Sequence, residues 1–310
     1  MKELQSAIKA AKLPLEKLVT DLLVVPIGLS DGLNDLSDFD RATGGEVERA
    51  LSRGECTGKK YESFIVKTID DSWSADRLLL IGMGEERPFS VSRLREVASA
   101  AALVGRRCRI NDMAFAVPDS INTEIGVQAV AEGLTLGEFS PDMYKAESDQ
   151  ESSSLRSLQV VSTHDDSELI ENAVARGRIL GECSNLAKRL ANEPGNKLSP
   201  SILAEQALEI LKGTSLEIDV LDEDSIRELG MGLLLGVAQG SVEPPRVIVM
   251  RHEPTGVTDG PVLALIGKGV TFDSGGISLK PAESMERMKE DMSGGAAVIC
   301  AMRAISQLNP

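Results

Sequence analysis

Residues 266–281 read Ile-Gly-Lys-Gly-Val-Thr-Phe-Asp-Ser-Gly-Gly-Ile-Ser-Leu-Lys-Pro, and the apolar run at 262–266 leads into them. A short apolar run followed by a glycine-rich loop predicts a buried strand. Open α/β sheets bind ligands beyond the carboxyl ends of their strands. We therefore expect Lys268 and Asp273 to lie at the carboxyl edge of a sheet, beside the tight turn that the glycine pair at 275–276 allows.

A second polar segment follows, because residues 288–297 read Met-Lys-Glu-Asp-Met-Ser-Gly-Gly-Ala-Ala. Its Asp291 precedes small residues that let a helix pack closely against the same region. Asp273 and Asp291 offer the hard oxygen ligands that divalent cations prefer, and one carboxylate can bridge two cations held about 3.5–4 Å apart. The pattern indicates a candidate metal site.

Two lysines accompany these carboxylates, and their roles have more than one interpretation. Lys268 is either a salt-bridge partner or, between two dications, a neutral amine that ligates metal. Lys280 is able to stay protonated and to face a substrate carbonyl oxygen. On spacing alone, a solvated loop with structural ion pairs is the favoured interpretation, so the generic chemistry leaves the question open.

The first 150 residues alternate short apolar runs with amphipathic stretches, which is typical of an α/β domain. We predict a sheet with helices on its faces. The turn Gly82-Met-Gly84 lacks the third glycine of a dinucleotide fingerprint and precedes an acidic pair that would repel phosphate, so a plain turn is favoured. The predicted strands are residues 22–27, 63–68, 77–81 and 112–116, and the predicted helices are residues 38–52, 92–104 and 124–139.

The polar stretch at 146–154, Ala-Glu-Ser-Asp-Gln-Glu-Ser-Ser-Ser, has nothing to anchor it in a core, and we place a hinge near it. The predicted domains are therefore residues 1–150 and residues 151–310. In the second domain we expect a largely parallel, two-sided sheet. Its predicted elements are strands at 158–162, 216–221, 246–250 and 262–266, a helix at 167–190 that ends in a sharp break at 192–196, and a helix that starts at Ser199-Pro200.

The composition bears on the partners of the protein. The 310 residues include 33 Lys and Arg against 48 Asp and Glu, a formal net charge of −15. This acidity argues against nucleic acid and anionic membranes as partners, and no apolar run reaches the roughly 18 residues that a membrane span needs. The four cysteines form no CxxC pair, and the two histidines lie too far apart for a zinc triad. We expect a cytoplasmic protein.

As an ordered string, residues 267–298 closely resemble the leucyl aminopeptidase (cytosol aminopeptidase) family. In that family the patterns GKGxxFDSGGxxLK and MKxDMxGAAxV carry metal ligands and a catalytic lysine. This chain matches nearly every position, with Gly295 where alanine is usual. The resemblance extends to residues 190–200, 235–241 and 244–246, whereas over the first 150 residues it is architectural only.

The resemblance implies a role for each of the four side chains. Asp273 becomes the carboxylate that bridges two metal ions. Lys268 and Asp291 become ligands of the second, more exchangeable ion. Lys280 becomes the electrophilic catalyst.

The resemblance also implies the fold and the reaction. The expected fold is a macro-like α/β amino-terminal domain followed by the first part of an α/β/α aminopeptidase catalytic domain. The expected reaction is hydrolysis of the amino-terminal residue of a peptide, preferentially leucine, by a metalloprotease with two divalent cations per site. Zinc, manganese or magnesium and, in the complete enzyme, bicarbonate are the implied cofactors, and a homohexamer is the implied assembly.

One further family motif, Asn-Thr-Asp-Ala-Glu-Gly-Arg, does not occur in these 310 residues. In the family it supplies the remaining carboxylate ligands and the arginine that holds bicarbonate. We therefore expect the chain to be part of a longer protein, or to be completed by a second polypeptide, and to be inactive alone. The alternatives are a non-catalytic fragment with an assembly or regulatory role, and a nucleotide-binding protein that uses its macro-like domain.

Overall fold

The computed structural model describes residues 6–85, 87–146, 155–254, 256 and 260–310, which form two compact units. The division between the units falls inside helix α5 (Ser167–Asn192), after Glu182. The hinge predicted near 146–154 lies almost wholly outside the described residues, and the domain boundary at 150/151 stays a prediction. Strand β6 (Ser157–Val161), which follows that boundary, pairs within the sheet of the first unit.

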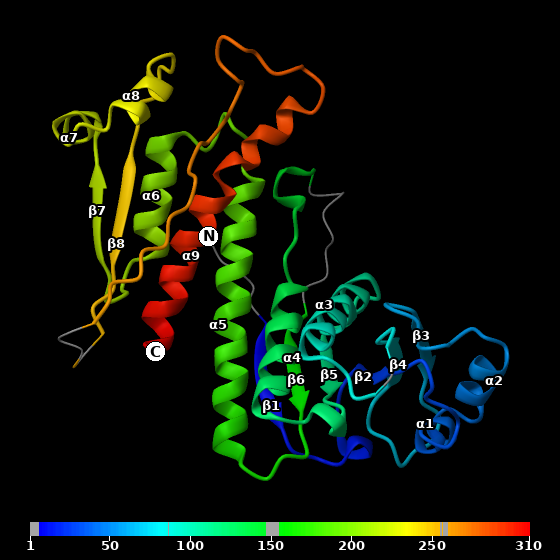
Figure 1. The fold of residues 1–310 in the computed structure, drawn as a ribbon. Helices are drawn as coiled ribbons and strands as arrows, with labels where there is room; N and C mark the ends of the chain where they lie inside the picture. Colours follow the sequence, from blue (N-terminus) through cyan, green and yellow to red (C-terminus); the bar gives the residue numbers. More distant parts are fainter. Residues whose placement is uncertain (1–5, 86, 147–154, 255, 257–259) are drawn as a thin grey trace. The chain divides into compact units, whose positions relative to one another are not determined.

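The first unit is built around one sheet with the strand order β1-β6-β5-β2-β4-β3 (Figure 1). Neighbouring strands are parallel except for β3, which runs antiparallel to β4. In the centre, Val24 of β2 is in register with Leu79 of β4 and with Phe115 of β5. The other strands are β1 (Ala7–Ala11), β2 (Leu22–Ile27), β3 (Ser63–Lys67), β4 (Arg77–Gly82) and β5 (Asp112–Ala116).

Alternate residues of the central strands are buried on opposite faces of this sheet. Leu22 and Val24 pack with α3, α4 and the start of α5, whereas Leu23 and Val25 pack with α1 and α2. Burial on both faces explains why β2 is apolar throughout. The helices are α1 (Ser37–Ala42), α2 (Glu46–Ser52), α3 (Val91–Arg107) and α4 (Glu124–Leu136), with short 3-10 helices η1 (Leu15–Lys17), η2 (Asp119–Ile121) and η3 (Asp142–Tyr144).

Two features of the first unit differ from the elements predicted from sequence. Strand β1 is not predicted, because its sequence Ala-Ile-Lys-Ala-Ala offers only one large apolar side chain. The single helix predicted at 38–52 is wrong. Gly44 and Gly45 separate α1 from α2 with φ angles of 67° and 88°, in the left-handed region that interrupts a helix.

The turn at Gly82-Met-Gly84 packs closely against the loop that precedes β3. A Cβ on Gly84 would lie 2.6 Å from the Lys60 Cβ, and a Cβ on Gly82 would overlap the Lys59 carbonyl oxygen. Both glycines are therefore needed for close approach of two backbone segments. The space beside the turn is filled by protein atoms rather than open to a phosphate.

Arg87 ties the segment after β4 to the loop after β2. Its Nε and Nη2 donate to the Asp31 carboxylate at 2.9 and 2.6 Å, and the Gly28 N–H donates to the same carboxylate at 3.0 Å. Burial raises the pKa of Asp31, but the hydrogen bonds from Arg87 and Gly28 outweigh burial and hold the pKa below its ordinary value. The two loops are thus joined by an ion pair whose carboxylate is almost fully covered.

The second unit contains the end of α5 and two strands that pair antiparallel, with Asp219 of β7 opposite Val249 of β8 (Figure 1). The parallel arrangement predicted for these strands is wrong, because the connection through α7 and α8 returns β8 alongside β7 in the opposite direction. Residues 262–266, predicted to be a strand, form none and have no strand partner among the described residues. The elements are α6 (Pro200–Ile210), β7 (Glu217–Leu221), α7 (Glu223–Glu228), α8 (Gly232–Ala238), β8 (Val247–Arg251), η5 (Met285–Met292) and α9 (Ser293–Leu308).

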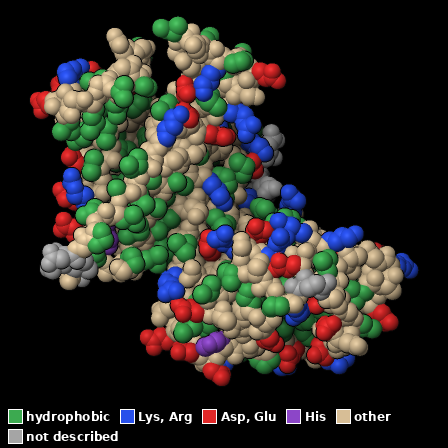
Figure 2. Space-filling model, viewed as in Figure 1, with side chains coloured by type: hydrophobic (Ala, Val, Ile, Leu, Met, Phe, Trp, Pro, Cys, Tyr) green, Lys and Arg blue, Asp and Glu red, His purple; other side chains and the backbone are tan. Residues whose placement is uncertain are grey.

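The second unit exposes many apolar side chains, and Figure 2 shows them gathered over the β7–β8 pair. Leu233 of α8 is 92% exposed, and Val262 and Ile266 are 95% and 91% exposed. Large apolar patches of this kind are typical of surfaces that contact other protein. In the part of the chain that the structure describes, no helix has both the length and the apolar character needed to cross a membrane.

Candidate functional site

Two lysine–aspartate ion pairs form where the loop at 267–281 meets the start of α9. The Lys268 Nζ lies 2.7 Å from the Asp291 Oδ2, and the Lys280 Nζ lies 3.0 Å from the Asp273 Oδ2. The Lys280 side chain also contacts Met288, which lies on the same short helix as Asp291, so the two pairs are neighbours. The structure therefore brings all four predicted side chains together.

The loop that carries Asp273 and Lys280 is closed by its own backbone. The Gly275 N–H donates to the Asp273 Oδ1, and the Lys280 N–H donates to the Ser274 carbonyl oxygen, each at 2.9 Å. Gly275 and Gly276 have φ angles of 100° and 80°, which other residues rarely adopt. This closure holds Asp273 and Lys280 within bonding distance of each other.

Asp291 reaches the site from the last turn of η5, immediately before α9 begins. The Gly295 N–H, in the first turn of α9, donates to the Lys268 carbonyl oxygen at 2.7 Å. The first N–H groups of a helix have no partner within the helix. Lys268 therefore contributes its backbone to the start of α9 and its side chain to Asp291.

The ion pairs shift two pKa values in opposite directions. The hydrogen bond from Lys268 to Asp291 raises the pKa of Lys268. The hydrogen bond from Lys280, and then that from the Gly275 N–H, lowers the pKa of Asp273. Lys268 and Asp273 are consequently charged at neutral pH in this arrangement.

Two further contacts lie beside the ion pairs, and the sequence alone does not predict them. The Lys280 Nζ lies 3.2 Å from the Met288 Sδ. The Lys289 Nζ donates to the Asn192 backbone carbonyl at 2.9 Å, across 97 positions of sequence. The position of Met288 and Lys289 in the same motif as Asp291 is a signal that they lie near the site, but no local pattern identifies the partners.

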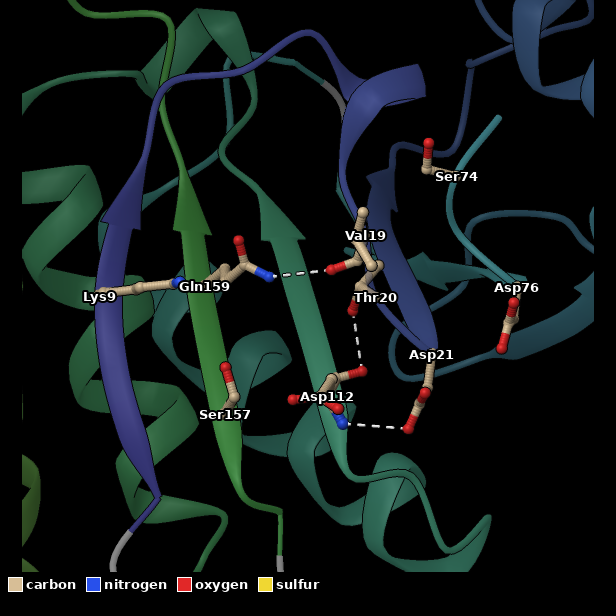
Figure 3. Close-up of a pocket in the computed structure, with 9 residues that line it drawn as sticks. All are labelled: Lys9, Val19, Thr20, Asp21, Ser74, Asp76, Asp112, Ser157 and Gln159. Carbon is tan, nitrogen blue, oxygen red and sulfur yellow. Dashed lines mark hydrogen bonds between the residues drawn. The ribbon is translucent and has the colours of Figure 1, made fainter. Parts of the chain in front are cut away.

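A polar hollow of about 340 Å³ lies in the first unit, at the amino ends of β2, β4 and β5 (Figure 3). Its polar groups bond to one another. The Gln159 Nε2 donates to the Val19 carbonyl oxygen at 3.3 Å, and the Asp112 N–H donates to the Asp21 Oδ2 at 3.1 Å. The lining includes none of the four predicted site residues, and its hydrogen bonds fasten strand ends.

Comparison with known proteins identifies the family. The model of the N-terminal domain of the cytosol aminopeptidase family matches residues 24–148, and the model of the catalytic domain of the same family matches residues 185–310. The chain belongs to the cytosol aminopeptidase family. The resemblance noted in the sequence is thereby confirmed.

Curated relatives and solved structures agree with this family. The chain is 38% identical to a probable cytosol aminopeptidase of Acidobacterium capsulatum and 40% identical to one of Solibacter usitatus, each over 96% of this chain and over 61% and 59% of the relative. A tomato leucine aminopeptidase mutant superposes with a TM-score of 0.83 at 26% identity, over 98% of this chain and 60% of that one. The bottromycin maturation enzyme BotP in complex with Mn superposes with a TM-score of 0.70 at 26% identity, over 93% and 56%.

These comparisons also confirm the fold class, an α/β amino-terminal domain followed by part of a catalytic domain. The chain spans about 60% of the length of the curated relatives that it matches.

The groups at the two ion pairs suit divalent cations in kind. Asp273 and Asp291 provide carboxylate oxygens, and Lys268 provides an amine that ligates once it is neutral. Among the described residues, no group of three or more His, Cys, Asp or Glu side chains is placed to hold a metal ion. The two carboxylates and the amine therefore suit a divalent cation in kind.

Proposed function

We propose that this protein is a metal-dependent aminopeptidase that hydrolyses the amino-terminal residue of peptides, preferentially a leucine-like one, by a two-metal mechanism. The observation that carries the proposal is the meeting of the Lys268–Asp291 and Lys280–Asp273 ion pairs at one place. The names of the similar structures, a leucine aminopeptidase and an enzyme in complex with Mn, support the substrate class and the choice of manganese.

Asp273, Asp291 and Lys268 are the proposed metal-holding residues, with Asp273 shared by both ions. Divalent cations bound there would polarise the peptide carbonyl and lower the pKa of a bound water to near neutrality. A protonated lysine has no lone pair to offer. Lys268 must therefore release its proton to hold a cation, and the hydrogen bond to Asp291 opposes that release because it raises the pKa of Lys268.

Lys280 is the proposed electrophilic catalyst. Its ammonium group donates to Asp273 and contacts the thioether sulfur of Met288, which is a weak acceptor. The N–H that faces sulfur is therefore easily redirected to the carbonyl oxygen of a substrate. A donor at the position where negative charge develops stabilises the transition state more than the ground state.

We further propose that additional residues, with bicarbonate, complete the site, and that the whole protein is a cytoplasmic homohexamer. The greater length of the relatives supports the additional residues, and the resemblance of residues 267–298 to the family supports the bicarbonate and the homohexamer. The name of the family and the four free cysteines support a reducing cytoplasm. A nucleotide-binding role is not proposed for the Gly82–Gly84 turn, because protein atoms fill the space beside it.

Hydrolysis of a leucine anilide by the full-length protein tests this function. Activity is expected to disappear when divalent cations are chelated and to return when manganese is added. Asp71→Ala, which removes an exposed aspartate of the first unit, is the matched control for Asp273→Ala. The proposal fails if the chelated protein remains fully active, or if Asp273→Ala is as active as Asp71→Ala.

A further inference from the structure

The end of α5 and the residues just after it contact both segments that carry the proposed metal-holding residues, namely the loop at 267–281 and η5. Asn192 is the last residue of α5, a helix of 26 residues, and its backbone carbonyl accepts a hydrogen bond from the Lys289 Nζ at 2.9 Å. The Asn192 Oδ1 lies 3.4 Å from the same ammonium group. The last carbonyls of a helix have no partner within the helix and carry partial negative charge. A lysine ammonium is therefore a favourable partner at this position.

Lys289 and Asp291 lie two residues apart on η5, which is a 3-10 helix. Three residues complete one turn of such a helix, so positions two apart point in different directions. Lys289 holds one side of η5 against the end of α5, while Asp291 on another side meets Lys268. The hydrogen bond to Asn192 thus constrains the position from which Asp291 reaches the site.

The other loop contacts the same segment through Phe272, the neighbour of Asp273. A Cβ added to Gly195 would lie 2.9 Å from the Phe272 Cδ2, so the ring packs directly on the glycine backbone. Asn192 and Gly195 are three positions apart. One short segment therefore supports the neighbours of both carboxylates.

We propose that Lys289 is a positioning residue, which through its bond to Asn192 fixes the separation of Asp291 from Asp273. This inference rests on the proposed function, since a two-metal site requires its ions about 3.5–4 Å apart. A displacement of about 1 Å of a catalytic group can cost roughly 100-fold in rate. The Lys289 ammonium group bonds to Asn192 and not to the site residues, so Lys289 acts through the placement of η5.

The test uses the full-length protein with Lys289→Met, Lys289→Arg and the surface control Lys212→Met. Lys289→Met is expected to lower kcat on leucine anilide roughly 100-fold with little change in KM. It is also expected to weaken manganese binding measured directly by calorimetric titration. Lys289→Arg is expected to keep most of the wild-type kcat and manganese affinity, because guanidinium also donates to a carbonyl oxygen. Lys212→Met is expected to behave as wild type.

A purely structural role for Lys289 predicts a different result. Lys289→Met would then lower the melting temperature but leave kcat and the manganese affinity unchanged, and this outcome overturns the inference, as does failure of Lys289→Arg to restore activity. Should Lys289→Met not fold, Lys289→Ala, which also removes the donor, is judged by the same criteria. If Asp273→Ala is inactive while Lys289→Met is normal, this inference fails alone; if Asp273→Ala is fully active, the proposed function itself fails.

Discussion

Gly267 and Gly294 lie backbone against backbone, and this contact sets Lys268 beside the start of α9. A Cβ on Gly267 would overlap the Gly294 carbonyl oxygen and lie 2.6 Å from the Gly294 carbonyl carbon. No side chain fits between the two segments. The glycine before Lys268 is therefore required by packing.

Gly267→Ala is expected to destabilise the second unit by about 1–3 kcal/mol, because the added methyl group must push two backbones apart. It should also reduce manganese binding by the full-length protein, since Lys268 moves away from Asp291. Gly269→Ala is the matched control, because a Cβ there meets nothing within 4 Å. Urea unfolding and metal analysis of both variants check the prediction, and equal behaviour of the two would contradict it.

Lys280→Ala is expected to lower kcat of the full-length protein by about 100- to 1,000-fold, the effect of losing one oxyanion donor. Its metal content should stay close to that of wild type, because Lys280 is not a proposed ligand. Lys67→Ala, on the exposed side of β3, serves as the control. Kinetics and metal analysis of both variants check this prediction. Loss of metal together with activity in Lys280→Ala would contradict it, because Lys280 would then act as a metal ligand.

The 310-residue chain by itself is expected to show little aminopeptidase activity. Its described residues offer Lys268, Asp273 and Asp291 but no group of three His, Cys, Asp or Glu side chains at one place. Purified chain with added manganese should turn over leucine anilide well below the range of about 1–1,000 per second that is usual for enzymes. Turnover within that range would show that these residues suffice.

Asp31→Asn is expected to destabilise the first unit by about 1–2 kcal/mol at pH 7, because it removes the charged partner of the partly exposed Arg87. The folded pKa of Asp31 lies below its unfolded value, so the ion pair stabilises the fold above that unfolded value, and its contribution is lost as the pH falls through the folded pKa. Urea unfolding at pH 7 and near pH 3 should show the difference between wild type and variant shrinking in acid. A difference that is independent of pH would rule out this ion pair as its source.

Much of the first unit follows from sequence because its central strands are buried on both faces and read as apolar runs. β1 is not predicted from sequence, because this edge strand has only one large apolar side chain and so contains no apolar run. The run at 262–266 has the signal but forms no strand, because a strand exists only when a partner accepts its backbone hydrogen bonds. Pairing is a property of the whole fold, which a local pattern does not contain.

The motifs at 267–281 and 288–298 predict the four site residues, and the structure adds the ion pairs that join them. The roles of Lys268 and Lys280 come from family resemblance, because lysines beside aspartates have the same appearance in an ordinary ion pair. The bond between Lys289 and Asn192 joins residues 97 positions apart, and only the folded chain reveals it.

The metal content of the full-length protein tests the central claim most directly. Wild type, Asp273→Ala and the control Asp71→Ala are loaded with manganese, freed of excess ion, and measured for bound manganese per chain. Wild type and Asp71→Ala should each hold about two ions, the number in a two-metal site, and Asp273→Ala should hold markedly fewer, because the shared carboxylate is gone. Equal manganese in all three proteins would contradict the assignment of Asp273 and the metal site built around it.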